Sequence, residues 1–133
     1  MSVRFAFDPA NQILLTRLEG ELTDDLARET DAGMRRHLVE KSPQVHIVDC
    51  SSVSKFSMSG EWIRQLAKRQ PAIEGLICRR FFVMPDTASF GLARMFQLAG
   101  EPHYDSVIIV RSLDEIFRTL SIEPPRFESL EST

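Results

Sequence analysis

Three short runs of almost only apolar residues constrain the fold of this chain more than any other feature. They are residues 46–48, 81–84 and 107–110, and the segments between them space their apolar residues at helical intervals. Apolar runs without polar alternation are typical of strands that are buried on both faces of a parallel sheet and connected by crossover helices. We therefore expect an α/β fold with a single-layer mixed sheet, mostly parallel and covered by crossover helices.

Two more strands precede these runs. Residues 3–7 and 13–18 are short and apolar, and the residues between them (DPANQ) favour a turn, so they predict an N-terminal hairpin. Residues 20–23 (GELT) should then end the extended pattern. Ser112 and Glu115 have the spacing of a capping box at a helix start. The expected helices lie at residues 24–41, around 62–67 with an end near Pro71, and at 90–99 with an end at 100–102. A fourth helix begins at this capping box, and Ile116, Phe117 and Leu120 form its inner face.

Composition indicates a globular protein and excludes several classes of function. Of 133 residues, 43% are hydrophobic, and 16 Lys and Arg against 19 Asp and Glu leave a net charge of −3. This charge gives no electrostatic basis for binding nucleic acid. No apolar segment is long enough for a membrane span, and the first residues do not have the pattern of a signal peptide. We interpret Cys50 and Cys78 as reduced core thiols, and we expect a cytoplasmic protein. The pattern predicts one domain over residues 1–122 and a frayed tail over 123–133.

The residue patterns that many enzymes and metal proteins use are not present. His37, His46 and His103 do not have the spacing of metal ligands, and His46 is better explained as a structural residue at the start of a strand. The glycine-rich nucleotide-binding motifs and the nucleophile-elbow motif are also missing from the sequence. We therefore expect no metal, no cofactor and no enzymatic activity.

Residues 45–60 are the segment in which a functional site is best placed. They indicate a buried strand that ends at Asp49, then a polar loop, then a Ser/Gly turn that opens a helix. This arrangement puts the hydroxyls of Ser57 and Ser59 at the positive end of a helix, where a phosphoryl group is electrostatically favoured. Trp62 follows in the first turn of that helix, either as an exposed interface anchor or as a packing residue.

Residues 49–60 (DCSSVSKFSMSG) resemble the signature of the STAS domain family, which includes bacterial anti-sigma-factor antagonists and the tails of sulfate transporters. In that family an Asp ends the central strand, and an Asp-Ser-Ser/Thr-Gly turn begins the next helix. Residues 20–23, 92–100 and 112–116 resemble further motifs of the family in the same order. The resemblance covers residues 3–121 and implies a SpoIIAA-like fold and the role of a regulatory protein-interaction module.

This chain departs from the family pattern at the functional turn itself. Ser57 stands where the family has Asp, and Met58 stands where the family has the Ser or Thr that is phosphorylated. A thioether cannot accept a phosphoryl group, so the usual switch is either absent or moved to Ser57 or Ser59. The resemblance implies a protein partner of the anti-sigma-factor or histidine-kinase-like ATPase type and leaves a homodimer open. The interaction surface that it implies consists of Thr23, Asp24, Ser57, Met58, Ser59, Gly60 and Trp62.

A small-ligand carrier is the alternative function. The STAS fold resembles that of CRAL-TRIO lipid-transfer domains, and Phe90, Met95 and Phe96 could then line an apolar cavity. The same spacing is equally that of a helix face packed in the core, which is the preferred interpretation. The leading hypothesis is thus a non-enzymatic interaction module, and the alternative is a carrier of an apolar ligand or lipid.

Overall fold

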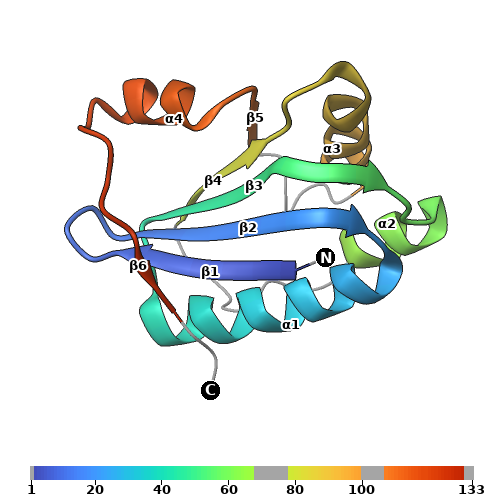
Figure 1. Cartoon of the computed structure of the whole chain (residues 1–133), viewed down its shortest axis with the longest axis horizontal. Coiled ribbons are helices and arrows are strands. Elements are labelled where there is room, and N and C mark those ends of the chain that lie inside the picture. Colours follow the sequence, from blue (N-terminus) through green and yellow to red (C-terminus); the bar gives the residue numbers. More distant parts are fainter. Residues whose placement is uncertain (1, 68–77, 100–106, 131–133) are drawn as a thin grey trace.

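A six-stranded sheet with helices on both faces forms the fold (Figure 1). The computed structural model describes residues 2–67, 78–99 and 107–130. Along the sheet the strands follow the order β5-β4-β3-β2-β1-β6. The elements are β1 (Ser2–Asp8), β2 (Ile13–Leu22), α1 (Asp24–Lys41), β3 (Val45–Phe56), α2 (Gly60–Ala67), β4 (Arg79–Val83), α3 (Thr87–Ala99), β5 (Ile108–Val110), α4 (Leu113–Leu120) and β6 (Glu128–Ser129).

The strand directions confirm the predicted fold class. Strands β1 and β2 form an antiparallel hairpin, and β2, β3, β4 and β5 then pair in parallel. The predicted start of α4 and the predicted end of α1 are also confirmed. The Ser112 hydroxyl accepts a hydrogen bond from the backbone N–H of Glu115 at the start of α4, and Ser42 adopts the left-handed conformation that ends α1. The predicted stops at Pro71 and at residues 100–102 lie outside the described residues, as does His103.

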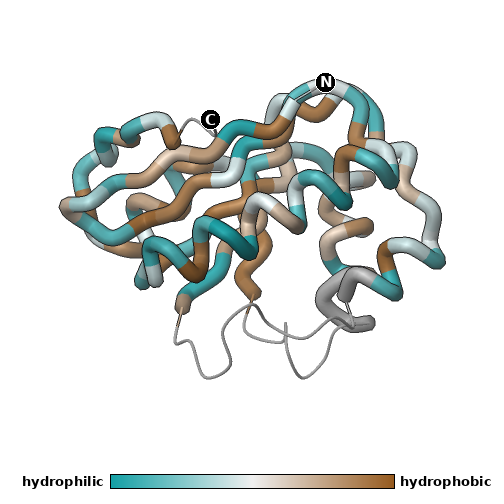
Figure 2. The backbone as a smooth tube through the Cα atoms, turned by 90° about the horizontal axis from the view of Figure 1, so that it is seen from below, coloured by the Kyte–Doolittle hydropathy of each residue, from teal (hydrophilic) through white to brown (hydrophobic). Residues whose placement is uncertain are grey.

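Apolar side chains cover both faces of the sheet and form two main cores. On one face, Ile47, Phe81 and Val83 pack against Ile116 and Phe117 of α4. The opposite face is covered by α1, α2 and α3, and a second cluster there includes residues Leu18, Leu26, Val48, Cys50, Met84 and Ala93. In Figure 2 the hydrophobic segments follow the strands between the helices. This double coverage explains why the central apolar runs show no polar alternation.

Strands β2 and β3 are longer than the sequence pattern predicts. Strand β2 continues past Gly20, and strand β3 continues past Asp49. In this added part of the sheet, residues 19–22 of β2 pair with residues 52–56 of β3. Register shifts occur on both sides of Gly20, whose φ of 90° is a conformation that glycine adopts readily. Asp49 therefore lies in mid-strand and is buried, with its Oδ2 atom 3.2 Å from the Nε atom of Arg17. Polar residues in this exposed half of β3 made it resemble a loop.

The C-terminal segment is not a frayed tail as far as residue 130. Residues Glu128 and Ser129 form β6 and pair antiparallel with β1, and the backbone N–H of Leu130 donates to the Phe5 carbonyl at 2.8 Å. Phe127 packs against the core beneath α4, and Leu130 packs against the cluster around Phe7. The edge of the hairpin is thereby covered, which reduces the exposure of unpaired backbone groups.

The two cysteines differ in their surroundings. Cys50 is buried, as predicted, and burial together with the nearby Asp49 raises the pKa of its thiol to about 12. Cys78 is only half-buried, so its prediction as a core thiol is wrong. In the described ranges, no helix is long and apolar enough to cross a membrane.

Candidate functional site

The Ser/Gly turn after β3 and the junction between β2 and α1 meet at one end of the sheet. Because β2 and β3 are parallel, the loops that follow them emerge on the same side. The backbone N–H of Ser57 donates to the Leu22 carbonyl at 2.8 Å, and the Ser57 hydroxyl donates to Glu21 Oε2 at 2.7 Å. Two segments that are more than thirty residues apart in sequence thus form one surface.

Ser59 links the starts of the two helices. Its hydroxyl accepts a hydrogen bond from the backbone N–H of Trp62 at 3.1 Å, which caps α2. Both the backbone N–H and the hydroxyl of Ser59 donate to the carboxylate of Asp24, at 3.1 and 3.4 Å. Thr23 caps α1 by accepting from the Leu26 N–H at 3.2 Å. The predicted residues Asp24 and Ser59 are therefore hydrogen-bonded to each other, and Thr23 caps the helix that Asp24 begins.

The sequence left open whether Trp62 is an exposed interface anchor or a packing residue. In the structure it is half-buried, so it packs in part and is exposed in part. Its ring packs against the core on the α1 face, and the guanidinium carbon of Arg28 lies 4.6 Å from the ring centroid. Arg28 is also paired with Asp25 at 2.9 Å. The indole N–H is buried and has no hydrogen-bond partner. The ring thus contacts the core of the α1 face and also carries the guanidinium group of Arg28 over its surface.

Met58 points inward more than its position in the turn suggests. It is half-buried and packs with Phe56 against the core on the α1 face. Ser57, Ser59 and Gly60 on either side of it are exposed. A Cβ added at Gly60 would meet only the end of the Arg64 side chain, at 3.5 Å. The exposed part of the predicted surface is therefore polar and small, and the thioether contributes mainly to the interior.

The aromatic residues that the sequence suggested for a ligand cavity are not brought together around one. Phe90 is half-buried, with the guanidinium carbon of Arg111 4.7 Å from its ring centroid. Met95 is 37% exposed, and the side chain of Phe96 lies outside the described part of the chain. A cavity does lie nearby, but neither Phe90 nor Met95 is among its lining residues.

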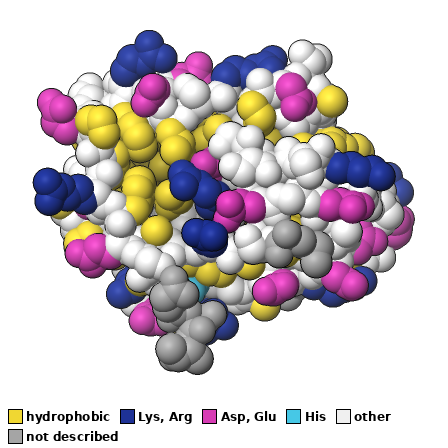
Figure 3. Space-filling view, viewed as in Figure 1, with side chains coloured by type: hydrophobic (Ala, Val, Ile, Leu, Met, Phe, Trp, Pro, Cys, Tyr) yellow, Lys and Arg dark blue, Asp and Glu magenta, His cyan; other side chains and the backbone are white. Residues whose placement is uncertain are grey.

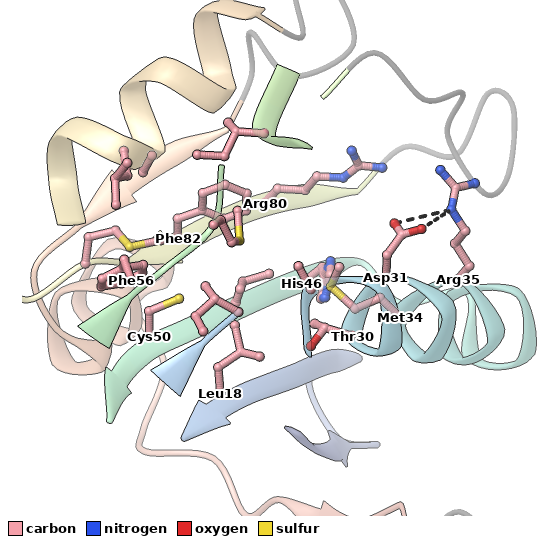
Figure 4. A pocket seen from close by; sticks show the side chains of 18 of the residues that line it. Leu18, Thr30, Asp31, Met34, Arg35, His46, Cys50, Phe56, Arg80 and Phe82 are labelled. Atoms are coloured by element: carbon pink, nitrogen blue, oxygen red, sulfur yellow. Dashed lines mark hydrogen bonds and ion pairs between the residues drawn. The ribbon is translucent and has the colours of Figure 1, made fainter. Parts of the chain in front are cut away.

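This cavity lies between the sheet and helices α1, α2 and α3, and its volume is about 190 Å³ (Figure 4). Its walls come from β2, β3 and β4 as well as from the helices, with Leu18, Val48, Phe82 and Met34 among them. Sequence reasoning missed it because the cavity forms only where three strands and three helices pack together, and no local pattern shows that packing. The available signal was the alternation within the strands, which places His46, Val48 and Cys50 on the same face.

The two buried titratable side chains of β3 on this face, His46 and Cys50, are uncharged near neutral pH. Burial, with a smaller effect of the Arg80 charge, lowers the pKa of His46 to about 3. The ring Nε2 atom of His46 lies 3.1 Å from the Thr16 hydroxyl, so this histidine is a structural residue as predicted. Over the described ranges, no group of three or more His, Cys, Asp or Glu side chains could hold a metal ion.

On the opposite face, charged side chains are mixed in sign. Figure 3 shows basic and acidic groups interspersed over the strands, with apolar side chains gathered beside α4. Arg4 pairs with Glu19 at 2.8 Å, and Arg17 pairs with the buried Asp49. The mixture provides no continuous basic surface in this view of the kind that binds nucleic acid.

Comparisons with known proteins agree with this architecture. No protein-family model matches the chain, and no curated protein matches its sequence. The anti-sigma factor antagonist SpoIIAA in its unphosphorylated form matches in structure with a TM-score of 0.61 and 15% identity, over 91% of this chain and 100% of that one. The Bacillus cell fate determinant SpoIIAA in its phosphorylated form matches with a TM-score of 0.57 and 14% identity, over 90% and 99%.

A third solved structure is similar to the same extent. It is an uncharacterised protein of the DUF3478 family with a SpoIIAA-like fold, from Shewanella loihica PV-4. The TM-score is 0.57 at 11% identity, and the match covers 90% of this chain and 92% of the other. At these identities the similarity concerns the fold, and it confirms the predicted resemblance at that level. The chain has a STAS-domain-like, SpoIIAA-like fold.

Proposed function

We propose that this protein is a non-enzymatic regulatory module of the STAS type that binds a protein partner. Its contact surface is the end of the sheet where the turn 57–60 meets the junction 21–24. The observation that carries this proposal is the hydrogen-bonded network of Ser57 with Glu21 and of Ser59 with Asp24, which presents two helix N-termini on one exposed surface. The proposed partner is an anti-sigma factor or a histidine-kinase-like ATPase, and the proposed location of the complex is the cytoplasm.

Regulation by phosphorylation does not fit this surface well. Met58 has no hydroxyl, and the hydroxyls of Ser57 and Ser59 are hydrogen-bonded to carboxylates. A phosphoryl group would add about −1.5 to −2 charges beside those carboxylates, which is electrostatically unfavourable. We therefore expect the intact mass to stay unchanged after incubation with ATP and the kinase partner. A phosphoryl increment located at Ser57 or Ser59 would restore the phosphorylation switch.

Gly60 offers a direct test of the contact surface. Its surroundings leave room for a side chain, and a carboxylate in the first turn of α2 is favourable for the helix dipole, so Gly60→Glu should fold normally. The same side chain would protrude into a bound partner. We expect Gly60→Glu to weaken binding of the candidate anti-sigma factor by at least about tenfold in isothermal titration calorimetry, which corresponds to about 1.4 kcal/mol.

The matched control is Thr119→Glu, which adds the same side chain at an exposed position of α4 on the other face of the sheet. Binding by this variant should equal that of the unmodified protein. If Gly60→Glu binds with full affinity, the contact surface lies elsewhere. Thermal unfolding of both variants shows whether each of them is folded in the titration.

A further inference from the structure

The cavity beneath α1 has a polar end and an apolar end. His46 and Arg80 are register partners near the starts of β3 and β4, and both line the cavity. Farther along the same strands and toward α2 and α3, the lining is apolar and includes Phe56, Met84 and Leu92. Figure 4 shows the side chains of Arg80, Asp31 and Arg35 on the side away from Phe56 and Cys50. A ligand that fits both ends has to be amphiphilic.

A hydroxyl group in the wall lacks a partner. Thr30 on α1 is 4% exposed and lines the cavity, and its Oγ1 atom is buried without a hydrogen bond. Buried hydroxyl groups are nearly always hydrogen-bonded, since leaving one unpaired costs free energy. The His46 ring, which also lines the cavity, is already hydrogen-bonded to the Thr16 hydroxyl. Thr30 is therefore a donor that a bound polar atom would satisfy.

The cationic groups at the same end favour an acceptor with negative charge. Arg35 pairs with Asp31, with its Nε atom 3.3 Å from Oδ2, and Arg80 also lines the cavity. A guanidinium group has five N–H donors and can serve several acceptors at once. Of the described lining residues, Asp31 is the one carboxylate beside these two arginines. A carboxylate on the ligand matches this end better than a neutral or cationic group.

The volume limits the size of the ligand. A cavity of about 150 Å³ accommodates benzene, and pockets for drug-sized molecules begin at about 300 Å³. A cavity of about 190 Å³ thus suits a molecule on the order of ten non-hydrogen atoms. We propose that this cavity binds a medium-chain monocarboxylic acid, with its alkyl chain among Phe56, Met84 and Leu92 and its carboxylate at Thr30 and Arg80.

The methionines provide an internal control for a binding experiment. Met34, Met58 and Met84 line the cavity, whereas Met95 on α3 does not and is exposed. With ¹³C-methyl-labelled methionine, titration with octanoate should shift the methyl signals of the three lining methionines and leave the Met95 signal in place. Single Met→Leu variants assign the signals. No shift at millimolar octanoate, or a shift at Met95 alone, would overturn the proposal.

Two variants and a neutral probe test the polar end. Thr30→Val and Arg80→Gln should each weaken octanoate binding about tenfold, whereas Thr119→Val on the exposed face of α4 should leave it unchanged. 1-Octanol has the same chain without the charge and should bind about tenfold more weakly than octanoate. Equal affinity for the two probes would show that the carboxylate is not recognised and would overturn the proposal. None of these measurements involves a protein partner, so their outcome is independent of the contact surface at Gly60.

Discussion

Gly33 allows α1 to lie directly against the ring of Phe5 on β1. A Cβ atom at position 33 would be 2.4 Å from Phe5 Cζ. The ring of His37, one helical turn farther along α1, also contacts Phe5, with 4.6 Å between the ring centroids. At Gly91 on α3, an added Cβ would meet nothing within 4 Å. Two substitutions of the same kind should therefore have opposite effects on stability.

We expect Gly33→Ala to lower the free energy of unfolding by about 1–3 kcal/mol through overpacking. Gly91→Ala should raise it by about 0.5–1 kcal/mol, because alanine is the better residue inside a helix. Urea unfolding of both variants measures the two changes. Stabilisation by Gly33→Ala would show that α1 does not pack against β1 as closely as described.

His46 should make stability depend on pH in the acid range. Its pKa is about 3 in the folded protein and 6.5 in an unfolded chain, chiefly because burial disfavours the charged ring. Between these values the unfolded state binds more protons, so the free energy of unfolding falls as the pH falls from 6.5 toward 3. The loss for this group approaches about 1.4 kcal/mol per pH unit. Burial lowers the pKa of His37 as well, in the same direction.

His46→Gln removes this titration while keeping a side chain that can bond to the Thr16 hydroxyl. Urea unfolding of the variant between pH 7 and pH 4.5 should show a shallower loss of stability than the unmodified protein shows. Parallel pH profiles of the two proteins would contradict the assignment of this pH dependence to His46.

Among the elements, the C-terminal segment stabilises the fold through strand pairing and side-chain packing that the sequence pattern did not predict. Deleting residues 123–133 removes the pairing of β6 with β1 and the packing of Phe127 and Leu130. We expect the deletion to lower the free energy of unfolding by about 2–4 kcal/mol, since two half-buried apolar side chains lose their contacts. Phe127→Ala alone should account for a part of the loss. A deletion variant with unchanged thermal unfolding would restore the interpretation of a frayed tail.

The sequence predicts best the strands that are buried on both faces, because burial requires apolar residues at nearly every position. The runs 46–48 and 81–84 are covered on both faces and therefore contain almost only apolar residues. Residues 51–55 of β3 are mostly exposed and polar, so they resemble a loop, and only their pairing with residues 19–22 of β2 makes them a strand. That pairing is a long-range contact, which local patterns do not encode.

At the scale of the whole molecule, the sequence also predicts part of the site. The resemblance to the STAS family implied one surface for the turn 57–60 and for Thr23 and Asp24. In the structure the backbone N–H of Ser59 donates to the Asp24 carboxylate, so the two segments lie side by side. The inward position of Met58 was not predictable, since it depends on how α2 packs on the sheet. The cavity was missed for the same reason, because three strands and three helices each contribute to its wall.

Hydrogen exchange on the complex with the candidate anti-sigma factor tests the central claim most directly. If the protein is a STAS-type interaction module, binding should slow amide exchange in residues 21–25 and 57–63, where two helix N-termini share one hydrogen-bonded surface. Exchange in α4 on the opposite face should stay as it is in the free protein. Protection of α4 with no change at the turn 57–60 would contradict this account of where the partner binds.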